Sequence, residues 1–231
     1  MTTIGWAVGA GLVGAVAGFF LPRLIASLPE RDPDDETTYA SIAAPARLPI
    51  VLAAAAGVVG AVLGWARAGQ PDLLAFVVLG VLGTGMGYVD LRRHLLPDLF
   101  TLPALLAGGV LLGVAAVAPP TDPATSYPRA WACAGGLLLA YFLLALVYPA
   151  GLGLGDVKLA GALGLYLGWL GWSFPVVGTV AAFLVGGMVS LVLLLSGRAT
   201  RRTAVPFGPS MLVGALVAVV WADPITTWYL S

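Results

Sequence analysis

The chain consists largely of long apolar blocks separated by short polar connections. Most blocks hold roughly 20 residues, enough for an α-helix to cross the about 30 Å of hydrocarbon in a bilayer. The blocks lie at about 4–28, 48–66, 72–91, 99–118, 129–149, 156–171, 174–196 and 207–229. This pattern predicts an all-α, polytopic membrane protein with about eight transmembrane helices, forming one membrane-embedded domain over residues 1–231.

The connections carry proline and charge, which is typical of loops. The first connection, residues 29–47, is short and acidic, and we expect it to be a cytoplasmic loop. The sixth block is short and rich in glycine, at Gly161, Gly164 and Gly168. Small residues let helix backbones approach closely in lipid, so this block is expected to pack tightly against its neighbours.

Composition agrees with a membrane location. Of the residues, 60% are hydrophobic and 10% are charged, whereas a soluble domain carries about 25% charged residues. The formal net charge is zero, so nothing indicates a nucleic-acid partner. The single cysteine, Cys133, lies within an apolar block and can build neither a disulfide framework nor a thiolate metal site. The first block is too long for a signal-peptide core and is expected to be a retained helix.

Basic residues are distributed unevenly between the two sides, and such residues favour cytoplasmic loops. If the loops after the first, third, fifth and seventh helices face the cytoplasm, the opposite side keeps only Arg67 and Arg129. The cytoplasmic side then holds Arg23, Arg31, Arg47, Arg92, Arg93, Lys158, Arg198, Arg201 and Arg202. Both termini are therefore expected to lie on the outer side of the membrane.

Two acidic residues stand at the ends of apolar blocks on the expected cytoplasmic side. Asp90 ends the third helix, and Asp156 begins the sixth after Gly153 and Gly155. Ionisable groups at membrane depth are costly and are usually functional. Two carboxylates brought together share a proton, so one activates water while the other protonates the substrate carbonyl or the leaving amine. Such a dyad hydrolyses a peptide bond without a metal or a cofactor.

Each of these residues also has a structural explanation. Asp156 follows glycines and precedes a helix, as an ordinary N-cap does. Asp90 could be a solvated residue at a helix end beside Arg93. The glycines before Asp156 either allow a tight turn or let backbone approach an extended substrate. Lys158 diverges from Asp156 on a helix and is expected either to anchor the cytoplasmic end or to bind a carbonyl.

A metal site is a further alternative, because Asp90, His94 and Asp98 have the i, i+4, i+8 spacing of one helical face. Pro97 argues against it. A proline disfavours helix at the residue before it, so Asp98 is expected to cap the fourth helix instead of continuing the third. We therefore predict no metal at this position.

Three motifs follow one another in the chain. They are Asp90 with Leu96-Pro97-Asp98 and Thr101-Leu102-Pro103, then Gly153-Leu154-Gly155-Asp156-Val157-Lys158-Leu159, and finally Pro206-Phe207-Gly208-Pro209. Together they resemble the type IV prepilin peptidases, the bacterial branch of the Gly-x-Gly-Asp membrane aspartyl proteases. A lone Gly-x-Gly-Asp motif is weak evidence for this family, but three of its motifs in the same order are specific evidence. The resemblance covers residues 80–231 and, more loosely, 18–29.

The resemblance implies a peptidase that removes the short basic leader of prepilins or pseudopilins, cutting after a glycine at the cytoplasmic face of the cell membrane. It aligns Asp90 and Asp156 with the family's catalytic pair. The implied partners are this substrate and the lipid bilayer. The remaining motif residues are expected to support the site or position the substrate; these are Pro97, Asp98, Gly153, Gly155, Lys158, Pro206, Phe207 and Gly208.

The chain departs from many members of that family in one respect. They carry paired Cys-x-x-Cys motifs after the first helix, associated with N-methylation of the new amino terminus by S-adenosylmethionine. Here the connection 29–47 contains no cysteine. We therefore predict a peptidase without the methyltransferase activity.

Other hypotheses remain open at this level. The acidic residues of the first connection could concentrate basic leaders electrostatically, or could form a simple solvated linker; they are Glu30, Asp32, Asp34, Asp35 and Glu36. A transporter could use Asp90 and Asp156 as proton or cation relays. Their expected position at one edge of the bilayer favours chemistry on a substrate from the cytoplasm. A catalytically inactive scaffold is a third possibility, which the intact motifs do not favour.

Overall fold

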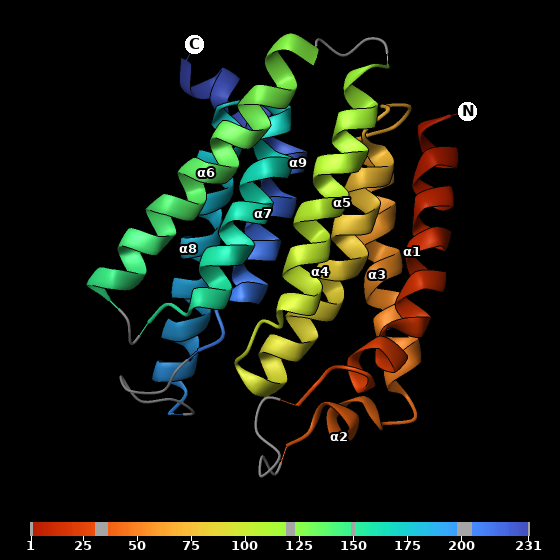
Figure 1. Cartoon of the computed structure of the whole chain (residues 1–231), viewed down its shortest axis with the longest axis vertical. Helices are drawn as coiled ribbons and strands as arrows, with labels where there is room; N and C mark the ends of the chain where they lie inside the picture. The colour runs from red at the N-terminus through yellow and green to blue at the C-terminus, as the bar shows by residue number, and fades with distance from the viewer. Residues whose placement is uncertain (1, 31–36, 119–122, 149–150, 198–204, 231) are drawn as a thin grey trace. The chain divides into compact units, whose positions relative to one another are not determined.

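The computed structural model describes residues 2–30, 37–118, 123–148, 151–197 and 205–230 (Figure 1). The regular structure within these residues is helical. The helices are α1 (Thr3–Ala26), α2 (Tyr39–Ala43), α3 (Leu48–Ala66), α4 (Leu73–Arg93), α5 (Asp98–Ala116), α6 (Pro123–Val147), α7 (Leu154–Leu170), α8 (Ser173–Leu195) and α9 (Gly208–Leu230). The predicted all-α class is confirmed, and each of the eight apolar blocks is a helix.

Six of these helices are long and apolar enough to cross a membrane, namely α1, α3, α4, α5, α6 and α8. Helix α7 has 17 residues and is buried along most of its length, and α9 has an apolar part over Gly208–Ala222. The chain is therefore a polytopic helical membrane protein. The count of eight spans, and the placement of both termini outside, stay predictions.

Two details differ from the expected elements. Helix α6 begins at Pro123, about six residues before the expected start, and the Tyr127 hydroxyl in this extra turn donates to the Gly109 carbonyl at 3.0 Å. The first connection also contains the short helix α2, which is capped by Thr38. The Tyr127–Gly109 contact joins residues 18 positions apart, which a hydrophobic pattern does not encode.

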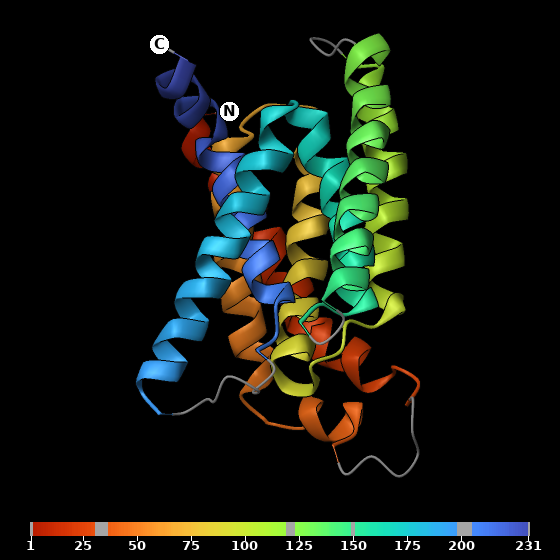
Figure 2. The same cartoon turned by 90° about the vertical axis from the view of Figure 1, so that its left-hand side faces the viewer.

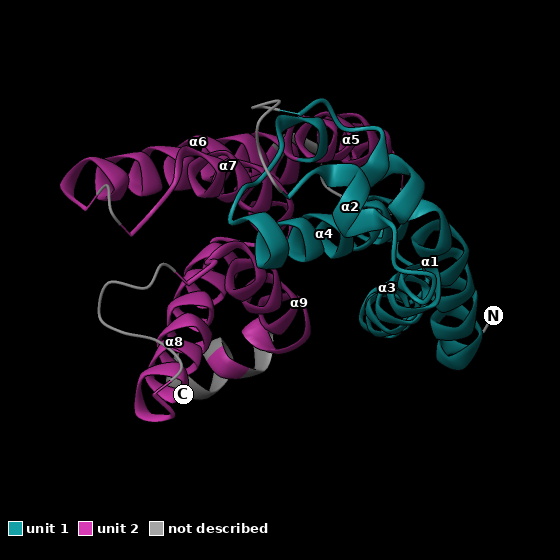
Figure 3. Cartoon of the chain, turned by 90° about the horizontal axis from the view of Figure 1, so that it is seen from below, with its two compact units in different colours: residues 1–100 teal, residues 101–231 magenta. Residues whose placement is uncertain are grey.

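The structure divides into two compact units, residues 1–100 and residues 101–231, coloured separately in Figure 3. The first contains α1 to α4 and the start of α5, and the second contains the rest of α5 and α6 to α9. The single domain expected over the whole chain stays a prediction.

The first unit is built on close packing of α1 against α3, which lie side by side in Figure 1. Glycines on both helices make this approach possible. A Cβ atom added at Gly18 would lie 2.6 Å from the Leu52 carbonyl oxygen, and one at Gly60 would lie 2.5 Å from the Ala10 oxygen. Because backbone meets backbone there, dispersion contacts between the helices replace the hydrophobic effect that lipid does not supply. Helix α4 packs against both α1 and α3.

In the second unit, α6 lies along α7 and α8 lies along α9, as Figure 2 shows. A Cβ atom at Gly164 would lie 2.6 Å from the Cys133 carbonyl oxygen on α6. The tight packing expected for this glycine-rich helix is confirmed. The Tyr166 hydroxyl of α7 donates to the Ala104 carbonyl of α5 at 2.9 Å, so α7 is joined to α5 as well.

We predict that Gly18→Ala destabilises the protein by about 1–3 kcal/mol, because the added methyl group must push two backbones apart. Gly9→Ala on the same helix is the matched control, since its Cβ would meet nothing within 4 Å. That variant should be neutral or stabilising by up to about 1 kcal/mol. Thermal unfolding in detergent measures both, and equal midpoints for the two variants would contradict the packing described.

Candidate active site

Asp90 lies in the last turn of α4, and only 4% of its surface is exposed. The helix ends just beyond it, where the His94 N–H donates to the Asp90 carbonyl at 2.8 Å and His94 adopts a left-handed conformation with φ of 53°. The hypothesis of a solvated helix-end aspartate is therefore wrong. A carboxyl group is buried at the end of an apolar helix, where ionisation is costly.

The expected helix break at Pro97 is confirmed. Helix α4 ends at Arg93 and α5 begins at Asp98, with the Pro97 carbonyl accepting from the Phe100 N–H at 3.0 Å. Asp90, His94 and Asp98 therefore do not share one helical face. Asp98 is exposed in the first turn of α5, where a negative charge is favourable, and Pro97 is half-buried. The described residues contain no group of three or more side chains suited to hold a metal.

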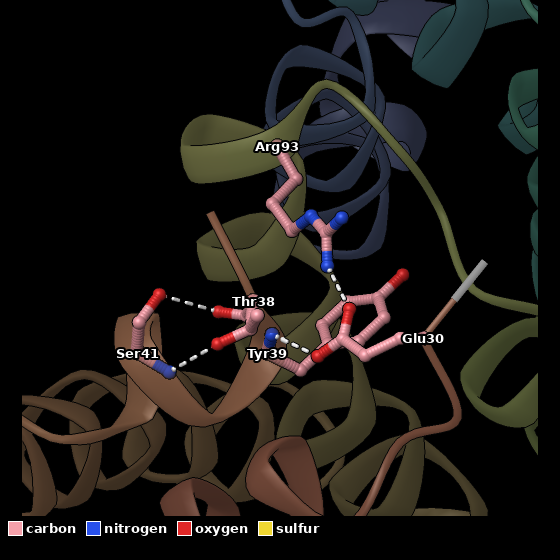
Figure 4. Close-up of polar contacts among 5 residues, drawn as sticks. All are labelled: Glu30, Thr38, Tyr39, Ser41 and Arg93. Atoms are coloured by element: carbon pink, nitrogen blue, oxygen red, sulfur yellow. Dashed lines mark hydrogen bonds and ion pairs between the residues drawn. The ribbon is translucent and has the colours of Figure 1, made fainter. Parts of the chain in front are cut away.

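The last turn of α4 is tied to the connection between α1 and α3, as Figure 4 shows. Arg93 forms an ion pair of 2.6 Å with Glu30 and lies over the Tyr39 ring, 4.3 Å from its centroid. The Tyr39 N–H donates to the second carboxylate oxygen of Glu30. Glu30 is therefore not part of a solvated linker. Asp32, Asp34, Asp35 and Glu36 lie outside the described residues, so electrostatic steering by them stays a hypothesis.

In the second unit, Asp156 is the third residue of α7 and is 9% exposed. Gly153 is the N-cap, so the hypothesis that Asp156 itself occupies that position is wrong. Its side chain instead reaches back, and Oδ2 accepts a hydrogen bond from the Gly153 N–H at 3.0 Å. This is the acidic half of a capping box. It uses one carboxylate oxygen, so Oδ1 is not needed to start the helix.

Gly153 does not have the backbone conformation that a tight turn requires of glycine. Gly153 has φ of −83° and ψ of 159°, an extended conformation that any residue adopts. A Cβ atom added there would lie 3.6 Å from Asp156 Oδ2, an ordinary contact. The resting fold therefore does not explain glycine at position 153. Gly155 is half-buried, and Lys158 is exposed while Asp156 is buried, as expected from their spacing.

The third motif lies where α9 begins. Pro206 and Phe207 are half-buried and Gly208 is buried. The Phe207 ring packs against Phe183 of α8 with 5.0 Å between centroids, and its carbonyl accepts from the Met211 N–H. These contacts give the motif a packing role at the start of the last helix.

Tyr141 on α6 lies near the third motif, and the sequence analysis missed it. It is buried within the second unit. Its ring lies 6.1 Å from the Phe183 ring, which in turn contacts Phe207. A tyrosine within an apolar block was the only signal in the sequence. A small cavity of about 10 Å³ with an apolar lining lies beside Tyr141 and Thr179.

Comparison with known proteins identifies the class to which these motifs belong. The profile of the type IV leader peptidase family matches residues 73–195, which include both Asp90 and Asp156. The chain therefore belongs to the type IV leader peptidase family.

The chain is similar to several proteins named prepilin leader peptidase/N-methyltransferase. It is 35% identical to the one from Aeromonas salmonicida over 171 residues, covering 71% of this chain and 54% of that protein. It is 32% identical to that of Legionella pneumophila over 163 residues, covering 69% and 53%. The chain thus matches about half the length of these relatives. No solved structure matches it.

Proposed function

We propose that this protein is a membrane aspartyl endopeptidase that removes the short basic leader of type IV prepilins or pseudopilins. The observation that carries the proposal is a pair of buried carboxyl groups, Asp90 and Asp156, each in the terminal turn of an apolar helix within the family match. Burial of an acid in such surroundings costs free energy, and acids found there are usually functional. Family membership and the names of the relatives supply the reaction class.

The proposed chemistry requires Asp90 and Asp156 to share one proton. The ionised carboxylate takes a proton from a water molecule, which attacks the scissile carbonyl while the protonated partner donates to the carbonyl oxygen. Collapse of the tetrahedral intermediate transfers a proton to the leaving amine and restores the pair. These steps use side chains and water alone. The capping bond of Asp156 supports this role, because the first turn of α7 fixes one oxygen and leaves Oδ1 for the reaction.

The proposed site lies at the cytoplasmic side of the cell membrane. The uneven distribution of basic residues supports this orientation. The two exceptions on the outer side are both engaged within the protein. Arg67 forms a 2.6 Å ion pair with Asp72, and Arg129 donates to the carbonyls of Gly168 and Trp169 at the end of α7. Their presence there has a structural cause, and the remaining basic residues all favour one side.

The proposed activity is peptide-bond hydrolysis without N-methylation. The relatives' names include an N-methyltransferase, but the connection between α1 and α3 holds no cysteine. Its described part instead forms a short helix that packs on α4 through Tyr39 and Ile42. Absence of methyl transfer from S-adenosylmethionine to a mature pilin amino terminus is the expected result for the purified protein.

We predict that Asp90→Asn and Asp156→Asn each lower kcat for leader cleavage by about a thousandfold or more, because an amide cannot carry the shared proton. Asn at position 156 still offers an oxygen to the Gly153 N–H, so α7 should keep its start. Co-expression with a prepilin and N-terminal sequencing of the product measure the effect. Asp98→Asn, at the exposed carboxylate of the first motif, tests whether that expected supporting residue contributes. Appreciable cleavage by Asp156→Asn would exclude the assignment.

The variant Gly153→Ser distinguishes a role of this glycine in folding from a role in substrate contact. Serine fits the extended conformation at this position and is a better N-cap than glycine, so stability should be unchanged or rise by up to about 1 kcal/mol. If the glycine leaves room for substrate backbone, the added side chain should raise KM for the prepilin. Thermal unfolding and steady-state cleavage together measure both effects. A variant with unchanged kcat and KM would show that substrate does not approach this glycine.

A further inference from the structure

Residues on both sides of Asp90 hold the same short segment. Tyr88, two residues before it, donates from its hydroxyl to the Ile42 carbonyl at 2.6 Å. Arg93, three residues after it, forms the 2.6 Å ion pair with Glu30. We propose that Arg93 is a positioning residue for Asp90, acting through a clamp made of Glu30, Tyr39 and Ile42. This inference rests on the proposed function and adds a role for residues outside the three motifs.

The geometry around Arg93 is that of a fixed side chain. Its side chain is 3% exposed, and the guanidinium has the carboxylate of Glu30 as its ionic partner and the Tyr39 ring as a stacking surface (Figure 4). Glu30 holds both together, because one carboxylate oxygen accepts from Arg93 and the other from the Tyr39 N–H. A planar guanidinium that is both paired and stacked has little freedom to change rotamer. Tyr39 and Ile42 are themselves buried, so the clamp is part of the packed unit.

The position of this clamp matters because Asp90 lies where a helix is weakest. The last turn of a helix lacks onward hydrogen bonds and frays more readily than its middle. Arg93 is three residues after Asp90 and therefore projects from the same side of α4. Holding the turn at Tyr88 and at Arg93 restricts the carboxyl group between them. Misplacement of a reacting group by about 1 Å can cost a hundredfold in rate, so this restriction bears on catalysis.

A role in general stability is the competing explanation, and the same unit contains a matched comparison. Arg67 and Asp72 form another ion pair of 2.6 Å at the opposite end of α4, and Arg67 lies 5.9 Å from the Phe76 ring centroid. Losing either pair removes a buried or half-buried charge contact from unit 1. Only the Arg93 pair adjoins Asp90. Arg92 provides a second control, because it is the neighbouring cation and is exposed.

The experiment compares Arg93→Gln, Arg93→Lys and Tyr88→Phe with Arg67→Gln and Arg92→Gln, each in the full chain in detergent. Cleavage of a prepilin gives kcat and KM, and thermal unfolding gives stability. We expect Arg93→Gln to lower kcat by about tenfold or more with little change in KM. Arg93→Lys should recover part of that loss, since it keeps the ion pair, and Tyr88→Phe should show a smaller loss. Arg67→Gln should lower stability and leave the kcat of folded protein unchanged.

An unchanged kcat in Arg93→Gln would overturn the inference, as would equal losses in Arg93→Gln and Arg67→Gln at equal loss of folded protein. Amide hydrogen exchange over residues 84–96 gives a readout that needs no activity. Exchange there should rise in Arg93→Gln and not in Arg67→Gln, and no rise would also overturn the clamp. If the wild-type chain does not cleave prepilins, the proposed function fails, and hydrogen exchange alone then decides on the clamp.

Discussion

An acidic side chain buried at the end of an apolar helix is stable only where its surroundings supply hydrogen bonds or a proton. Asp90 and Asp156 both face this constraint, one in the last turn of α4 and the other in the first turn of α7. Asp156 meets part of it through the N–H of Gly153. In the proposed enzyme a shared proton meets the rest, and that same proton is what makes peptide hydrolysis possible without a metal.

The helices that carry these residues depend on small side chains for their placement. Glycine contacts bring α1 against α3 and α6 against α7 to distances that no larger residue allows. Polar contacts then fix the ends: Tyr88 and Arg93 fasten the end of α4 to the connection between α1 and α3, and Tyr166 joins α7 to α5. Packing thus sets where each helix lies, and a few hydrogen bonds set where its reactive end points.

The sequence was sufficient for features that short-range physics determines. Hydrophobic runs located the eight long helices, and Pro97 correctly placed the break between α4 and α5. It was insufficient where distant residues meet. Glu30 and Arg93 are 63 positions apart, and the charge of Glu30 was read as part of a possible steering cluster or solvated linker, whereas it is paired. The cap of α7 was misplaced for a different, local reason, because Gly153 at the N-cap and Asp156 at the third helical position share the capping role.

The central claim is that the carboxyl groups of Asp90 and Asp156 come close enough to share a proton. Cysteines at both positions, in a chain whose single natural cysteine is replaced by Cys133→Ala, allow cross-linking in native membranes with a short bifunctional maleimide. Cysteines replacing Glu30 and Arg93, which are in contact, serve as the positive control. The account predicts an efficient cross-link between positions 90 and 156. No cross-link between them, under conditions where the control pair reacts, would contradict it.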